Sequence, residues 1–99
     1  MMQTVGKFPF QISDIVELEM PEGAEILVVE SQPVYSLASA EQACMWARVD
    51  TEAPMERRRF RLCGTGHPLK ENVGGHYGSF QMAKGRLVWH VFAMEGGGR

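Results

Sequence analysis

Hydrophobic and polar residues alternate over most of the chain, with the period of two that is typical of β-strands buried on one face. In residues 14–20, apolar positions alternate with Glu17 and Glu19. The Pro-Glu-Gly sequence at residues 21–23 predicts a turn, and the β-branched, apolar run in residues 24–31 predicts a second strand. We therefore expect these two segments to form a hairpin.

The same alternation continues after the middle of the chain. Residues 43–50 predict a strand, and so do residues 57–63, in which Arg59 and Arg61 share the face opposite the core. A stretch beginning with Gly64 then carries the chain through a polar connection toward the C-terminal strands.

Two C-terminal segments, residues 76–82 and 86–94, predict a closing hairpin in which Gly85 supplies the positive φ of a tight turn. A weaker strand is expected in residues 4–10. Pro9 has no backbone N–H to donate, so this strand fits best at the edge of a sheet.

The alanine-rich segment SLASAEQA has two interpretations. Its helix-forming residues favour a short helix around residues 36–43, and Ser39 with Gln42 fits a capping box. A loop is the alternative.

Six to seven strands with short connections predict an all-β fold, either a compact antiparallel barrel or a sandwich. A chain of 99 residues has room for one core, so we expect a single domain over residues 1–95. The glycine-rich residues 96–99 are expected to be a disordered tail.

No export signal is evident, and the apolar runs are far shorter than the roughly 20 residues that cross a bilayer. We therefore expect a cytoplasmic protein that does not enter a membrane. Cys44 and Cys63 form no C-x-x-C pair, so they are expected to be reduced and buried.

Charge is divided unevenly along the chain. Residues 1–50 hold two cationic and eight acidic side chains, a net charge of -6, whereas residues 51–99 hold eight cationic and four acidic ones, a net charge of +4. This division suits an anion-binding face, but acidic and basic strands that neutralise each other as neighbours are the favoured explanation. The acidic total, -2, argues against general nucleic-acid binding.

The sequence GTGHP follows the strand that carries four arginines. Glycine amides, a hydroxyl and an imidazole could hold an anion such as phosphate, with arginine supplying bidentate hydrogen bonds. The alternative is a tight turn in which the glycines serve backbone geometry and the histidine caps a carbonyl. The residues that would contact the anion are Arg59, Arg61, Gly64, Thr65, Gly66 and His67.

Tyr77 lies between glycines, where its ring could rest on a planar ligand, or it could fill the core with its hydroxyl hydrogen-bonded. The three histidines lack metal-site spacing, so neither a metal nor another cofactor is expected. No spacing brings a base and an orienting acid to His67 or Cys63, so we expect no enzyme.

Six motifs, in order, carry a family resemblance: KFPF (7–10), MPEGAEIL (20–27), MWARVD (45–50), RRFRLCGTGHPL (58–69), GSFQ (78–81) and LVWHVF (87–92). They resemble a family of small proteins of tailed phages, prophages and plasmids that has no assigned activity. The segment 33–42 departs from it by its length. The resemblance implies a mobile-element origin, a site of action in the host cytoplasm and a small β fold.

The leading hypothesis is a non-enzymatic phage accessory protein that acts against a host system by stoichiometric binding, with an anionic signalling nucleotide as its ligand. The pocket would combine the anion-binding residues with Tyr77, in a homodimer or higher homo-oligomer if it lies across a subunit face. The alternatives are direct inhibition of a host protein through the acidic hairpin of residues 14–30, a minor virion or assembly component, and a small hydrolase.

Overall fold

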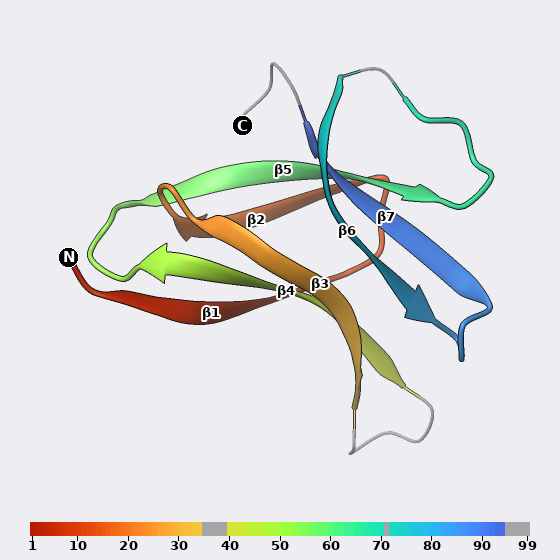
Figure 1. Ribbon diagram of the computed structural model, residues 1–99, viewed down its shortest axis with the longest axis horizontal. Helices are drawn as coiled ribbons and strands as arrows, with labels where there is room; N and C mark the ends of the chain where they lie inside the picture. Colours follow the sequence, from red (N-terminus) through yellow and green to blue (C-terminus); the bar gives the residue numbers. More distant parts are fainter. Residues whose placement is uncertain (35–39, 71, 95–99) are drawn as a thin grey trace.

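The computed structural model describes residues 1–34, 40–70 and 72–94. This part of the chain is all-β and contains no helix, so the predicted fold class is confirmed (Figure 1). Accordingly, none of the described residues forms a helix of the length and apolar character needed to cross a membrane. The seven strands are β1 (Gln3–Phe10), β2 (Ile15–Pro21), β3 (Glu25–Pro33), β4 (Glu41–Asp50), β5 (Met55–Gly64), β6 (Val73–Met82) and β7 (Leu87–Met94).

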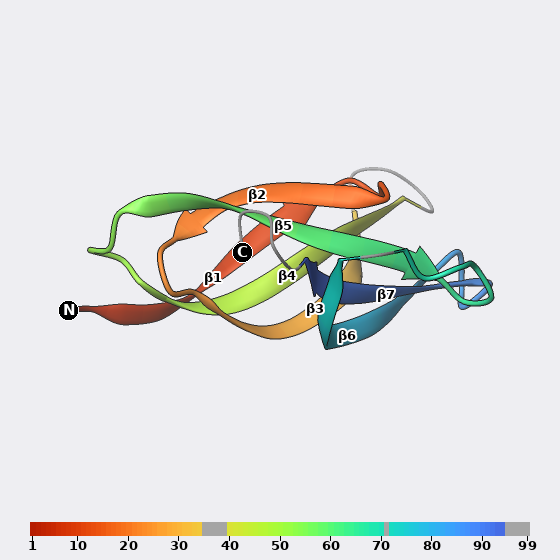
Figure 2. The ribbon, with the colours of Figure 1, turned by 90° about the horizontal axis from the view of Figure 1, so that it is seen from above.

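The strands form two antiparallel sheets, one of order β1-β4-β3 and the other of order β2-β5-β7-β6. Figure 2 shows the two layers, with β2 and β5 lying across from β3 and β4. Where β3 approaches β6, a Cβ atom on Gly78 would lie 2.8 Å from Val29 Cγ2, so this contact requires glycine. Ser31 Oγ donates to Gln81 O at 2.6 Å beside it. The sheets meet here without a shared ladder, so the sandwich is the correct alternative.

The core lies between the two sheets, because the inward positions of each strand are apolar. Phe10 and Phe80 come from different sheets and contact edge to face, with 5.9 Å between ring centroids. Phe60 is fully buried at the centre of β5. The apolar alternation thus identified the buried face of β5 correctly.

The predicted hairpin of residues 14–31 is wrong in its pairing. The turn itself is present, with Gly23 at φ +81° and Ala24 N donating to Pro21 O at 3.1 Å. However, β2 pairs with β5 and β3 pairs with β4, so the turn passes the chain from one sheet to the other. Glu22 N donates to Pro54 O at 2.8 Å and ties this corner to the next one.

The predicted helix around residues 36–43 is wrong over the part of this segment that the structure describes. Residues 41–43 belong to β4, which is hydrogen-bonded to β1 and β3 on its two sides. Gln42 caps no helix: its Nε2 donates to Phe10 O at 2.8 Å. Residues 36–39, which include the other half of the expected capping box, lie outside the described residues, as does the expected tail 96–99.

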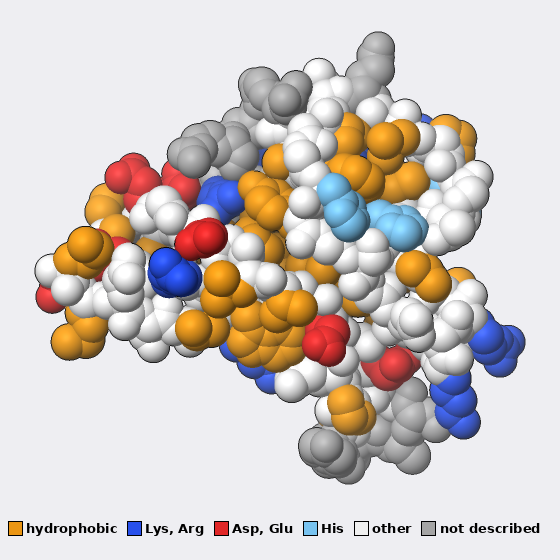
Figure 3. All heavy atoms as spheres, viewed as in Figure 1, with side chains coloured by type: hydrophobic (Ala, Val, Ile, Leu, Met, Phe, Trp, Pro, Cys, Tyr) orange, Lys and Arg blue, Asp and Glu red, His pale blue; other side chains and the backbone are white. Residues whose placement is uncertain are grey.

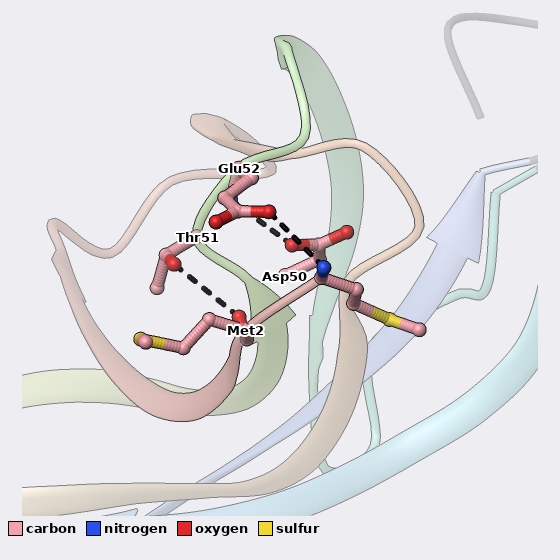
Figure 4. Close-up of polar contacts among 5 residues, drawn as sticks. Met2, Asp50, Thr51 and Glu52 are labelled. Atoms are coloured by element: carbon pink, nitrogen blue, oxygen red, sulfur yellow. Dashed lines mark hydrogen bonds and ion pairs between the residues drawn. The ribbon is translucent and has the colours of Figure 1, made fainter.

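Strand β1 lies at the edge of its sheet, as the position of Pro9 predicted. Its first residues are held by the turn after β4 (Figure 4). Thr51 donates to Met2 O from its backbone N at 2.9 Å and from its Oγ1 at 3.3 Å. The Met1 amino group lies 3.1 Å from Glu52 Oε1. At this end, the ladder between β1 and β4 therefore includes the first residue of β1 and the last residue of β4.

The closing hairpin of β6 and β7 is confirmed. Its turn is bent by three residues of positive φ, Ala83 (+54°), Lys84 (+56°) and Gly85 (+85°), and Arg86 N donates to Ala83 O at 3.2 Å. The resulting register places Ser79 directly opposite His90.

Candidate functional site

The outer face of β5 presents alternate arginines, and the neighbouring strand β2 presents glutamates to two of them. Arg59 Nε lies 2.7 Å from Glu17 Oε2, and Arg57 Nη2 lies 3.8 Å from Glu19 Oε2. The register that aligns each pair is the antiparallel ladder of β2 and β5. Mutual neutralisation of acidic and basic strands, one of the two explanations of the charge asymmetry, is therefore confirmed here.

The third arginine of this face, Arg61, lies opposite Ile15 instead of a glutamate. It lines a cleft of about 300 Å³ at the end of β5. Lys70 adds a second cation and Asp14 a single carboxylate, so the charged groups of the cleft sum to one positive charge. The lining residues are Asp14, Arg61, Leu62, Cys63, Gly64, His67, Pro68, Lys70 and Trp89, which we call the Arg61 cleft.

Two side-chain donors of the Arg61 cleft are buried without a hydrogen-bond partner among the described residues. They are Arg61 Nε and Trp89 Nε1. A buried N–H that makes no hydrogen bond costs roughly 1–3 kcal/mol, so such atoms are uncommon and mark places that an acceptor would satisfy. Both atoms are donors, and an acceptor would have to reach them beneath the surface of the cleft.

The GTGHP turn is closed on its own backbone. His67 N donates to Gly64 O at 3.0 Å, and Thr65 N donates to Val88 O of β7 at 3.2 Å. Gly66 is exposed at φ +87°, a conformation that favours glycine. These two amides are therefore used within the protein, in agreement with the turn interpretation, and the cations of Arg61 and Lys70 remain as the candidate groups for an anion.

Gly64 has a second role beside the turn. A Cβ atom there would lie 2.9 Å from His67 Nδ1 and 3.4 Å from Trp89 Cζ3, so only glycine lets the imidazole fold back over the strand. The His67 and Trp89 rings contact edge to face, with 6.5 Å between centroids. These three residues separate the Arg61 cleft from a second cleft of about 330 Å³ that is also lined by Thr65 and Arg86.

Both cysteines are free. Cys44 is buried as expected, and this burial raises the pKa of its thiol, which the nearby Lys7 charge partly opposes. Cys63 is only half-buried, contrary to the expectation, because it lies on the outer face of β5. Its Sγ lies 3.4 Å from both Gly64 O and His67 O, and so holds the turn against the strand.

Arg58 and Tyr77 lie on the inner face of the same sheet. Arg58 is 5% exposed, and its Nη1 donates to Ala24 O at 2.6 Å while its Nη2 donates to the Tyr77 hydroxyl at 3.0 Å. The Tyr77 ring packs edge to face on Phe60. Tyr77 thus follows the core alternative, and the sheet separates it from the Arg61 cleft.

The structure therefore brings together only part of the predicted site. Arg61, Gly64 and His67 share one cleft, and Thr65 lines the second. Arg59 is paired with Glu17. Asp14, Lys70 and Trp89 were not predicted as site residues, because they come from three separate segments and no local pattern joins them.

A second polar group was also missed, on the outer face of β6 and β7. Thr65 Oγ1 lies 2.8 Å from His90 Nε2, and Ser79 Oγ lies 2.7 Å from His90 Nδ1. Ser79 Oγ also lies 3.1 Å from His76 Nε2. Counting back from the predicted three-residue turn pairs Met82 with Arg86 and places Ser79 opposite Trp89. The observed ladder pairs Met82 with Leu87, and this shift of one residue brings Ser79 opposite His90. Within the described ranges, no group of three or more histidine, cysteine or acidic side chains could hold a metal ion.

Comparison of the chain with curated proteins and with solved structures gives no match. A family model does match, over residues 1–98, nearly the whole chain. The chain belongs to that family, which is described as Domain of unknown function (DUF7352).

Proposed function

We propose that this protein binds an anionic small molecule stoichiometrically, without chemical turnover, in the Arg61 cleft. The observation that carries the proposal is the position of Arg61. Its neighbours on the same face are neutralised by glutamates, whereas Arg61 lies opposite Ile15 and lines a cleft with a second cation. A guanidinium beside a concave surface is the preferred protein group for phosphate and carboxylate.

The ligand class proposed is a nucleotide, with its phosphate on Arg61 and Lys70. The volume of about 300 Å³ is at the lower end of small-molecule sites, which favours a mononucleotide over a dinucleotide. Trp89 supplies an aromatic surface for a base, and Asp14 supplies an acceptor for a hydroxyl group of the ligand. The resemblance to phage and plasmid proteins supports a site of action in the host cytoplasm, where capture of a signalling nucleotide would disable a host response.

Inhibition of a host protein through the acidic residues 14–30 receives less support. Glu17 and Glu19 are paired with arginines of β5, and Glu25 lies 3.7 Å from Arg48 Nη1. The two strands of that segment also belong to different sheets, so they present no common acidic surface.

Isothermal titration calorimetry with guanosine 5′-monophosphate and inorganic phosphate tests the proposal. Arg61→Ala should weaken binding at least tenfold, because a hydrogen bond to a charged group is worth about 1.5–3 kcal/mol. Arg59→Ala is the matched control: it removes an arginine from the same face and strand, but one that is already paired. Its affinity should stay within about twofold of wild type. Equal affinity of the Arg61→Ala variant and wild type, or no binding by wild type at millimolar ligand, would overturn the proposal.

A further inference from the structure

The hydroxyl of Ser79 lies between two imidazoles. His90 Nδ1 is 2.7 Å from Ser79 Oγ, and His76 Nε2 is 3.1 Å from the same atom. On its far side, His90 Nε2 is 2.8 Å from Thr65 Oγ1. A hydroxyl within hydrogen-bond distance of a base that a third group orients is the arrangement that activates a nucleophile.

The proton of Ser79 is directed at an imidazole nitrogen in two of the three arrangements of this chain that satisfy every hydrogen bond. If His90 donates from Nε2 to Thr65, its Nδ1 accepts the Ser79 proton, and His76 donates to Ser79 Oγ. If all three bonds reverse, the Ser79 proton goes to His76 Nε2 instead. If His90 alone reverses, Ser79 Oγ accepts from both rings, because a hydroxyl oxygen has two lone pairs. A neutral imidazole offers one donor and one acceptor, so both nitrogens of His90 are used in every case.

The group is open to a reactant. Ser79, His76 and Thr65 are exposed, and His90, the closer base, is half-buried. The His76 ring rests on Phe92, with 5.1 Å between centroids. Figure 3 shows histidine side chains lying side by side on this surface next to hydrophobic ones. An apolar acyl group therefore has a surface to lie on while the serine reacts.

We propose that Ser79 is an activated nucleophile that accepts an acyl group from an activated ester. Ser79 Oγ forms a bond to the ester carbonyl carbon as its proton passes to His90 Nδ1. The bond between that carbon and the leaving oxygen then breaks, and the leaving group takes the proton from His90. The products are an ester on Ser79 and the free alcohol, and no other reactant is needed.

Thr65 is a positioning residue in this reaction. Its hydroxyl accepts the Nε2 proton of His90 and so keeps Nδ1 free for the serine, but it does not contact the reacting atoms. The proposal is independent of the nucleotide site, because it uses the outer face of β6 and β7, and neither Ser79 nor His90 lines the Arg61 cleft.

The test is to incubate the protein with p-nitrophenyl acetate and to locate acetyl groups by peptide mass spectrometry. Hydroxylamine treatment separates serine esters, which it removes, from lysine amides, which it leaves. Ser13 is an exposed serine outside the group and serves as the internal control. General-base assistance is worth about 10²–10⁴-fold, so Ser79 should be acetylated at least 100 times faster than Ser13.

Variants then assign the roles. His90→Gln should lower the rate of Ser79 acetylation about 100-fold or more, and His76→Gln should lower it less. Thr65→Val should slow the reaction, whereas Thr65→Ser, which keeps the hydroxyl, should restore it. Acetylation of Ser79 no faster than that of Ser13 in the wild-type protein would overturn the proposal, and so would a wild-type rate in His90→Gln. Circular dichroism of each variant confirms that the fold is kept.

Discussion

The two ends of the outer face of β5 carry the same side chain in different circumstances. At the first end, Arg57 and Arg59 lie opposite glutamates of β2 and form ion pairs with them. At the other end, Arg61 lies opposite Ile15 and lines a cleft instead. The strand, the face and the residue type are shared, so the neighbour across the ladder makes the difference.

Arginines on one strand therefore differ in role: Arg57 and Arg59 form ion pairs, whereas Arg61 lines a cleft. An exposed ion pair contributes only about 0–1 kcal/mol, but it occupies the guanidinium and cancels its field. A guanidinium with no carboxylate opposite it on the ladder keeps its donors for a ligand, and in the Arg61 cleft the one carboxylate, Asp14, is offset by Lys70. The change from glutamate to isoleucine at the start of β2 therefore leaves Arg61 without the ladder partner that Arg57 and Arg59 have.

The largest expected effect concerns Arg58, the arginine that holds β5 in place from its inner face. Arg58→Met should lower the free energy of unfolding by about 2–4 kcal/mol, because Ala24 O and the Tyr77 hydroxyl lose a buried donor. Urea denaturation followed by fluorescence measures the change. Arg57→Met, an exposed change on the same strand, should stay within about 0.5 kcal/mol. Equal losses in the two variants would contradict the inner role of Arg58.

An intermediate effect, on ligand affinity, is expected when Arg61 is given an acidic partner on β2. Ile15→Glu places a carboxylate opposite Arg61 without altering any residue of the cleft. It should weaken nucleotide and phosphate binding about tenfold, since the new glutamate would compete for the guanidinium. Calorimetry measures the loss, and Ile15→Gln, with the same shape and no charge, should bind as wild type does. A loss of the same size in Ile15→Gln would show that charge is not the cause.

The smallest effect is expected from releasing an arginine that is now paired. Glu17→Gln removes the partner of Arg59 and should change the free energy of unfolding by no more than about 0.5 kcal/mol, because water reaches both side chains and screens the pair. This difference should disappear in 1 M NaCl, which screens surface charges. Thermal denaturation at low and high salt tests it. A larger loss that persists in high salt would mean that the pair has a structural role beyond charge.

Several features of the fold followed from the sequence because they depend on local pattern. Alternation placed the strands and identified Phe60 as buried, Pro9 placed β1 at an edge, and Gly85 placed the last turn. The helix expected around residues 36–43 failed where it overlaps β4, since pairing with strands on both sides outweighs the weak helical preference of alanines.

The candidate sites were less predictable, because each depends on residues that other strands supply. Arg59 and Arg61 are equivalent by sequence position, and only the register of β2 distinguishes them. The sequence left two positions open for Tyr77, in the site or in the core. Its hydrogen bond with Arg58 on the inner face of the sheet shows that it belongs to the core. Ser79 and His90 have ordinary spacing along the chain, and the β6–β7 ladder makes them neighbours.

By itself the sequence determined which segments are strands, which face of most of these strands is buried, and where the chain turns. These properties follow from the period of two and from the backbone preferences of glycine and proline, which act over a few residues. Tertiary structure alone decided which strands are neighbours, and with that which arginines are neutralised and which hydroxyl meets an imidazole. Such contacts join residues far apart in the chain, and their pairing depends on how two whole sheets pack, so no local pattern encodes them.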